Sequence, residues 1–96
     1  MSIDSNSGIT VHISGELTFV TVPALSKDNR KLIAKNQRVA FDLSQVTSCD
    51  NTGVALLVAL ASFAKSLRKE ISFVNLPEQL LAIVDAVGVR NILPIL

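Results

Sequence analysis

The residues of this chain best suited to chemistry lie in one short polar turn, Asp50-Asn51-Thr52-Gly53, directly before a long apolar run. Thr52 offers a hydroxyl, and Asp50 offers a carboxylate two residues earlier. Enzymes that use such groups need a base beside the nucleophile or a pair of carboxylates with separated pKa values. The turn contains no histidine, lysine or second acid, and the four glycines are too scattered to form a phosphate loop. We therefore expect no catalytic residue and no enzymatic activity.

The hydroxyl of Thr52 lies where a helix is expected to begin, and this position suggests two roles for it. A phosphate there would add close to two negative charges beside Asp50. The helix dipole would favour that charge locally, while the charge would oppose burial of the turn in an interface. The unmodified hydroxyl would suit a protein contact. A purely structural alternative is that Asn51 and Thr52 only cap the helix.

The chain offers little for a metal or a cofactor. His12 falls on the polar side of an alternating strand, and no second histidine or nearby cysteine completes a metal site. Cys49, the single cysteine, is expected to be a buried small apolar residue without a redox role. We expect no metal and no cofactor.

Composition limits the classes of partner. The 96 residues are expected to form one domain, residues 1–96, and nine Lys+Arg against eight Asp+Glu give a formal net charge of +1. Without Trp or Tyr to stack on bases, nucleic acid is not an expected partner. The first eight residues lack the pattern of a secretion signal, so we expect a cytoplasmic protein. A hydrophobic content of 49% suggests apolar surface reserved for a partner.

Hydrophobic periodicity predicts three strands that alternate with three helices. A helix between two strands forms a crossover, so successive strands should be parallel, and those ending at Leu43 and Leu76 should be neighbours. The result is a small α/β sandwich. Thr21 is the expected cap of the first helix, Gly88 the expected end of the last, and residues 45–48 a polar connection. The strands are predicted at Ile9–Ser14, Val39–Leu43 and Glu70–Leu76, and the helices at Val22–Lys35, from Asp50 or Asn51, and from Pro77.

The central helix has two apolar stripes instead of one. An amphipathic surface helix needs a single stripe about 100° wide. We expect one stripe to pack on the domain's own core and part of the other to be covered by a partner; the alternative is a more deeply buried helix. The apolar run is shorter than the roughly 20 residues that cross a bilayer. The first stripe is Leu56, Leu60, Phe63 and Leu67, and the second is Val54, Leu57, Val58, Ala61 and Ala64.

Four cations, Lys27, Arg30, Lys31 and Lys35, recur at intervals of three and four along the first helix. They therefore share its outer face. With Asp28 among them, a solvated surface is the simpler interpretation, and a patch for phosphates or lipid headgroups is the alternative.

Three short segments carry a resemblance to a known family. Gly15-Glu16-Leu17 follows the first strand, Asp42-Leu43-Ser44 ends the second, and Asp50-Asn51-Thr52-Gly53-Val54 opens the apolar helix. Together they resemble the STAS domains, the family of anti-sigma factor antagonists and sulfate-transporter tails. The resemblance covers essentially the whole chain. It implies a single domain with a mixed sheet of about four strands and helices packed on one face.

Two branches of that family are compatible with the turn. In the antagonist branch, the hydroxyl directly before the glycine is phosphorylated by an anti-sigma kinase, and Thr52 occupies that position. The unmodified form then captures the kinase and frees the sigma factor. In the other branch, the small STAS subunit of the Mla phospholipid transporter, the turn is closer to Asp-Thr-Gly-Gly. There Asn51 replaces the threonine and Thr52 replaces the first glycine, so the turn favours the antagonists.

The rest of the chain favours the Mla branch. The short length, the run from Thr52 to Leu57 and the Phe63-Ala64-Lys65 segment are similar to the Mla subunit. This resemblance implies a non-catalytic subunit that binds and stabilises or regulates the cytoplasmic ATPase of an ABC transporter maintaining outer-membrane lipid asymmetry. Contact with the inner membrane would be indirect, through that complex. The expected partner-binding residues are Glu16, Leu17, Thr18, Asp50, Asn51, Thr52, Gly53, Val54 and Leu57.

Overall fold

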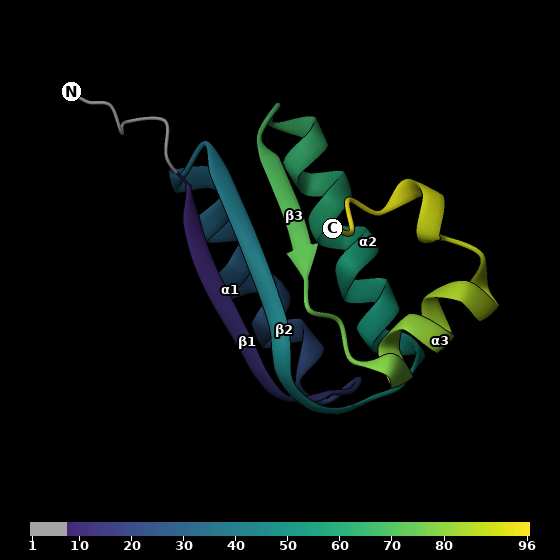
Figure 1. Ribbon diagram of the computed structural model, residues 1–96. Helices are drawn as coiled ribbons and strands as arrows, with labels where there is room; N and C mark the ends of the chain where they lie inside the picture. The colour runs from purple at the N-terminus through teal and green to yellow at the C-terminus, as the bar shows by residue number, and fades with distance from the viewer. Residues whose placement is uncertain (1–7) are drawn as a thin grey trace.

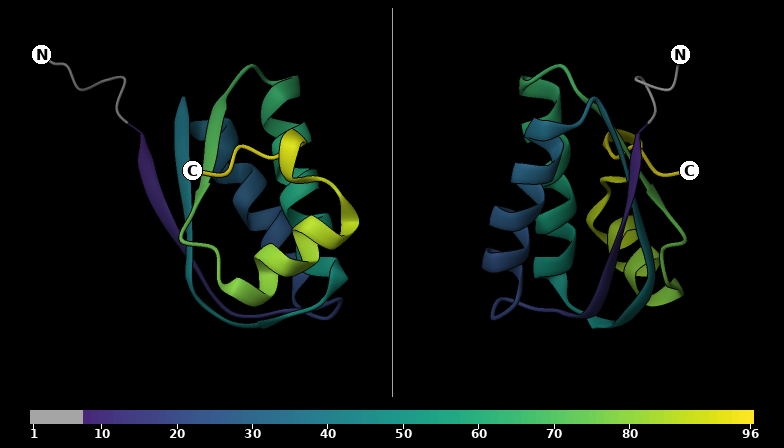
Figure 2. Two further views of the ribbon diagram at one scale, coloured as in Figure 1. Left: turned by 45° about the vertical axis from the view of Figure 1, so that its right-hand side comes forward. Right: turned by 90° about the vertical axis from the view of Figure 1, so that its left-hand side faces the viewer.

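The computed structural model describes residues 8–96, in which three strands alternate with three helices (Figure 1). The sheet has the order β1-β2-β3, and both neighbouring pairs are parallel. The helices lie together on one face of this sheet (Figure 2). A short 3₁₀ turn, Arg90–Ile92, precedes the C-terminal tail. The elements in order are β1 (Ile9–Leu17), α1 (Val22–Lys35), β2 (Arg38–Cys49), α2 (Asn51–Ser66), β3 (Glu70–Val74) and α3 (Glu78–Val87).

The expected mixed sheet of about four strands is wrong for the part of the chain that the structure describes, where the sheet has three parallel strands. Each of these strands is joined to the next through a helix, and such a crossover returns the chain in the same direction. The free edge of β3 is instead occupied by the C-terminal tail. The Phe73 N–H donates to the Pro94 carbonyl at 2.9 Å, and the Leu96 N–H donates to the Phe73 carbonyl at 3.0 Å.

Strands β1 and β2 extend further than their hydrophobic patterns predict. Their pairing continues to Leu17 and Cys49, so residues 45–48, predicted as a connection, belong to β2. The register slips between His12 and Ser14 and again after Gly15, whose φ is +84°. Such irregularities increase the local bend of a strand. The two strands consequently curve together and end side by side below the helices (Figure 1).

The core lies between the sheet and the helix layer. Strand residues that face the helices are apolar and buried, whereas the opposite face carries small or polar residues such as Thr10, Ala40 and Ser72. Phe41 and Phe73, on neighbouring strands, have ring centroids 5.8 Å apart. The buried core includes Ile13, Leu17, Ile33, Phe41, Leu43, Leu56, Leu57, Leu60, Phe73, Leu80 and Val84.

Helix α2 contacts α1 on one side and α3 on the other, and this position buries most of both apolar stripes. Val54 and Leu57 of the second stripe are buried, and Val58 is partly buried. Most of both stripes therefore packs within the domain, as the interpretation of a deeply buried helix predicts, and only part of the second stripe borders the surface. Within residues 8–96, no helix is long and apolar enough to span a bilayer.

Candidate partner-binding site

The turn that opens α2, residues 50–53, is hereafter called the elbow. Asp50 is the N-cap residue of α2, with extended backbone, and its Oδ1 accepts from the Thr52 backbone N–H at 2.8 Å. The Thr52 hydroxyl also donates to this oxygen. The Gly53 N–H donates to the Asp50 carbonyl at 2.9 Å, and the Asp50 N–H donates to the Leu17 carbonyl at 3.2 Å. Of the two residues at which the helix was expected to begin, Asp50 is thus the cap, and its bond to Leu17 attaches the elbow to the end of β1.

The hydrogen bonds of the elbow determine its charge. The hydroxyl of Thr52, followed by its backbone N–H, holds the pKa of Asp50 below its ordinary value. Asp50 is therefore ionised at neutral pH and is a weak base. His12 lies on the open face of the sheet, with its Nδ1 3.8 Å from Asp42 Oδ2. The elbow thus offers a carboxylate, an amide and a hydroxyl for recognition, without a strong base for catalysis.

Metal binding finds no support in the described residues. Between Gly8 and Leu96, no group of three His, Cys, Asp or Glu side chains is arranged to hold an ion. Cys49 is buried directly before the elbow, and burial, followed by the charge of Asp50, raises the pKa of its thiol. A raised pKa keeps the thiol protonated and unreactive, consistent with the expected structural role.

The loop between β1 and α1 lies beside the elbow and exposes two large apolar side chains. Phe19 is 74% exposed and Val20 is 73% exposed. Phe19 lines a shallow hollow together with Asp50, Asn51 and Thr52. An exposed apolar pair next to a polar turn is a typical composition for a protein-binding surface.

Thr21 occupies the N-cap position of α1 as predicted, but its side chain fixes the conformation of this loop instead of bonding to the helix. Its hydroxyl donates to the Glu16 carbonyl at 2.7 Å and accepts from the Thr18 N–H at 3.0 Å. The Val20 N–H donates to the Thr18 hydroxyl at 3.2 Å. No side-chain cap hydrogen bond is formed at the start of α1, where Pro23 removes one N–H donor. These loop bonds hold the backbone so that Phe19 and Val20 face outward.

A shallow apolar groove continues from the elbow between α2 and α3. Ala55 and Ala59 lie one helical turn apart on α2, and their small side chains leave a hollow of about 400 Å³ beside Val87, which is 51% exposed. Asn51 belongs to both this groove and the elbow. The elbow, the β1–α1 loop and the groove therefore form one continuous surface, lined in the groove by Asn51, Val54, Ala55, Val58, Ala59, Val87 and Val89.

The structure separates the expected partner-binding residues into two groups. The first group is at the surface: Asp50 and Asn51 are exposed, and Thr52 is partly exposed. Glu16 is also exposed, at the adjoining end of β1, where its carboxylate accepts from the Ser48 hydroxyl at 3.3 Å. Thr18 is partly exposed in the loop. The second group is buried: Leu17, Gly53, Val54 and Leu57. Of these, Val54 also lines the groove.

Phe19 and Val20 are the surface residues that the sequence interpretation missed. The available signal is two consecutive large apolar residues in a short connection after a strand. Because the carboxyl ends of parallel strands meet at one edge of a sheet, that connection had to lie near the elbow.

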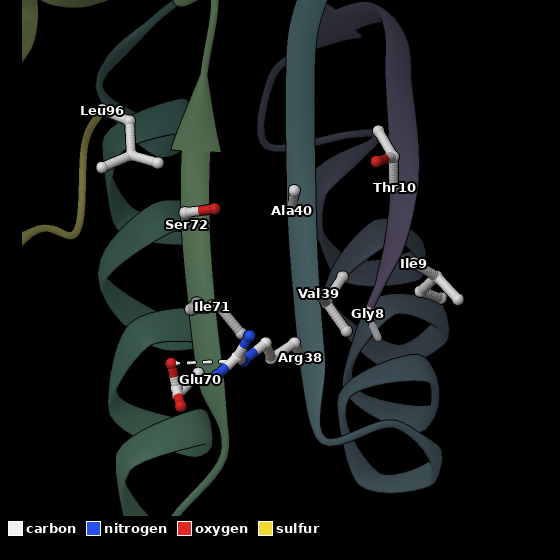
Figure 3. Close-up of a pocket in the computed structure, with 10 residues that line it drawn as sticks. All are labelled: Gly8, Ile9, Thr10, Arg38, Val39, Ala40, Glu70, Ile71, Ser72 and Leu96. Carbon is white, nitrogen blue, oxygen red and sulfur yellow. Dashed lines mark ion pairs between the residues drawn. The ribbon is translucent and has the colours of Figure 1, made fainter. Parts of the chain in front are cut away.

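A separate hollow of about 510 Å³ lies at the opposite end of the strands, on the sheet face away from the helices (Figure 3). It exists because Thr10, Ala40 and Ser72 are small. Arg38 and Glu70 form an ion pair at its rim, with Nε and Oε2 3.5 Å apart. This hollow is remote from the elbow.

Comparisons with known proteins agree with this geometry. The family model described as "Mlab, STAS domain" matches residues 2–94. The chain is similar to the anti-sigma-B factor antagonist of Bacillus subtilis (strain 168), with 25% identity over 91 residues that cover 95% of this chain and 84% of that protein. It is also similar to the solved structure of the anti-sigma factor antagonist SpoIIAA in its unphosphorylated form. That likeness has a TM-score of 0.74 and 11% identity, covers 99% of this chain and 83% of the other, and shows the fold alone.

Proposed function

Because the chain belongs to the STAS domain family, we propose that it is a non-catalytic protein-binding module, an anti-sigma factor antagonist switched by phosphorylation of Thr52. The single observation that carries this proposal is the position of the Thr52 hydroxyl. It lies at the N-terminus of α2, is hydrogen-bonded to Asp50 and borders the exposed Phe19. The partner in this proposal is an anti-sigma kinase.

Phosphorylation would change this surface through local electrostatics. A phosphate on Thr52 replaces the hydroxyl that now donates to the ionised Asp50, so attraction becomes repulsion between two anions. The same charge would lie beside Phe19, where a docked partner excludes water, and burying an unpaired charge is costly. The unmodified form is therefore the partner-binding form, and the phosphorylated form is the released one.

Incubation with an anti-sigma kinase and ATP tests this proposal. We expect intact mass spectrometry to show the addition of one phosphate, and peptide mapping to assign it to Thr52. Thr52→Val should abolish the addition because it removes the acceptor oxygen while keeping the side-chain shape. Thr47→Val, at an exposed threonine of β2, is the matched control and should leave the addition unchanged. Modification at a different residue, or none, would contradict the assignment.

A second candidate function is supported by the groove and by the description of the matching family model. In this alternative the chain is a subunit of an Mla-type phospholipid ABC transporter, binds its cytoplasmic ATPase and stabilises the productive form of that ATPase. Permanent partners bury more apolar surface than reversible ones. The groove beside Ala55 and Ala59 adds such surface to the elbow. Nucleotide hydrolysis would belong entirely to the partner.

Co-purification distinguishes the second candidate from the first. A bulky charge in the groove, Ala59→Arg, should prevent co-purification of the ATPase and leave the isolated domain folded, because Ala59 is exposed. Thr52→Glu should also weaken the complex. Lys27→Glu, on the exposed surface of α1, is the control and should have no effect. If both Ala59→Arg and Thr52→Glu leave co-purification and lipid transport intact, the transporter assignment of this surface is wrong.

A further inference from the structure

Most of the positive charge of the chain lies at the end of the molecule opposite the elbow. Helices α1 and α2 both finish where β2 and β3 begin (Figure 1). Residues 30–38 and 65–70, hereafter the basic end, contain seven of the nine Lys and Arg residues, and Glu70 is their only acidic residue. Although the overall net charge is only +1, the positive and negative side chains are therefore unevenly distributed over the molecule.

The two segments of the basic end form one surface. The Glu70 N–H donates to the Gln37 carbonyl at 3.0 Å, and the Gln37 side-chain amide donates to the Arg68 carbonyl at 3.4 Å. Arg38 and Glu70 are paired across β2 and β3 and form the ion pair visible in Figure 3. Cations from loops about thirty residues apart in sequence are thus brought side by side.

Helix dipoles account for only part of this arrangement. Lys35 and Lys65 lie in the last turns of α1 and α2, where a cation offsets the partial negative charge of the helix end. Arg38, Arg68 and Lys69 lie outside the helices. In residues 8–96, the only ion pair at this end is the one between Arg38 and Glu70. The remaining cations leave a large uncompensated charge.

An exposed leucine lies among these cations. Leu67 is 42% exposed at the end of α2, directly before Arg68, whose φ of +58° turns the chain sharply. Neither tyrosine nor tryptophan is present in the chain to stack on nucleic-acid bases. Cations around an exposed aliphatic side chain match the composition of surfaces that bind the headgroup layer of anionic membranes.

We propose that the basic end binds the surface of an anionic phospholipid bilayer. Lys65, Arg68 and Lys69, with Lys35 beside them, contact headgroup phosphates, and Leu67 enters the headgroup layer. The acidic residues outside the basic end, including Asp50 and Glu16, are repelled by anionic headgroups, so the elbow side does not bind the membrane. The elbow then faces away from the bilayer and stays accessible to a protein partner.

Vesicle sedimentation tests this proposal with the full chain. Vesicles of phosphatidylcholine containing about 30% phosphatidylglycerol should sediment the protein at low salt, whereas pure phosphatidylcholine should not. Raising the salt to about 0.5 M should release most of the bound protein because the interaction is screened. Failure to sediment with anionic vesicles at low salt would overturn the proposal.

Matched charge reversals distinguish the basic end from a general effect of net charge. Lys65→Glu with Arg68→Glu should weaken vesicle binding by about tenfold or more. Lys27→Glu with Arg90→Glu changes the net charge equally outside the basic end and should alter binding by less than about twofold. Circular dichroism verifies that both variants are folded. If the two variants lost vesicle binding to the same extent, binding would depend on net charge alone and not on the basic end.

Two further arms test the chemical class of the partner. Leu67→Ser should reduce vesicle binding by about threefold while leaving its salt dependence unchanged, because the apolar contribution is not screened. Poly-glutamate at matched charge concentration should compete weakly. If poly-glutamate or duplex DNA binds the basic end more tightly than anionic vesicles do, the partner is an acidic polymer and the membrane proposal fails.

Discussion

Gly53 determines how closely the elbow approaches the end of β1. A Cβ atom at this position would lie 3.2 Å from the Leu17 Cβ and 3.4 Å from the Cys49 Cβ, which is tight packing. The backbone φ is not unusual, so the requirement for glycine is steric. This explains in physical terms why glycine follows the hydroxyl residue: it lets Thr52 sit at the surface while the next residue packs on the core.

A larger side chain at Gly53 should therefore destabilise the protein. We expect Gly53→Val to lower the free energy of unfolding by about 1–3 kcal/mol, because its branched atoms overlap Leu17. Gly53→Ala should be milder, since shifts of a few tenths of an ångström relieve its contacts. Urea denaturation measures both. The control is Ala55→Val, at an exposed position of the same helix, which should change the free energy of unfolding by about 0.5 kcal/mol or less. If Gly53→Val changed it as little as Ala55→Val does, the steric explanation would be wrong.

Residue types in the elbow were informative in the sequence because Asp, Thr and Gly each have few roles at a helix start. Asp50 as the cap follows directly from that chemistry. The burial of Leu17 and Leu57 does not, because an apolar residue beside a loop can face either the core or a partner. Phe19 and Val20 were missed for the same reason: apolar character alone does not show that a side chain is exposed.

The position of α2 between two other helices makes it the main support of the elbow. Leu57 is fully buried one turn after Gly53, whereas Ala59 is exposed in the groove. Truncating a buried leucine removes apolar contacts and leaves a cavity. Stability should therefore depend on which face of α2 is changed.

We expect Leu57→Ala to lower the free energy of unfolding by about 2–5 kcal/mol. Ala59→Ser, on the open face of the same helix, is the matched control and should change it by about 0.5 kcal/mol or less. Chemical denaturation followed by circular dichroism provides both values. Similar effects for the two substitutions would mean that the burial of α2 is wrongly described.

Helix boundaries were predicted more accurately than strand boundaries. Helix α1 spans Val22–Lys35 as predicted, and Gly88 ends α3 with φ of +84°, a conformation that favours glycine. The second half of β2 is predicted as a connection because Ser44, Gln45 and Thr47 are polar and interrupt the apolar pattern; in the structure all three are exposed. Register slips in the pairing with β1 remove the simple alternation on which strand prediction depends.

At the scale of the whole molecule we propose a function for each of two opposite ends, and the sequence alone indicated only one of them, the elbow. Alternating strands and helices determine a parallel sheet with helices on one face, so the elbow could be placed at the carboxyl ends of the strands. The basic end required the three-dimensional arrangement, because its cations come from two segments separated in the chain. A net charge of +1 gave no indication of their grouping.

The central claim is that the chain acts by binding a protein through the elbow and the exposed pair beside it. Titration calorimetry of an anti-sigma kinase or a transporter ATPase with the wild type and with Phe19→Ser/Val20→Ser tests it most directly. Both side chains are about three-quarters exposed, so the double variant should keep its denaturation midpoint. We predict that it binds the partner at least about tenfold more weakly. Binding by the double variant as tight as that of the wild type would contradict the account.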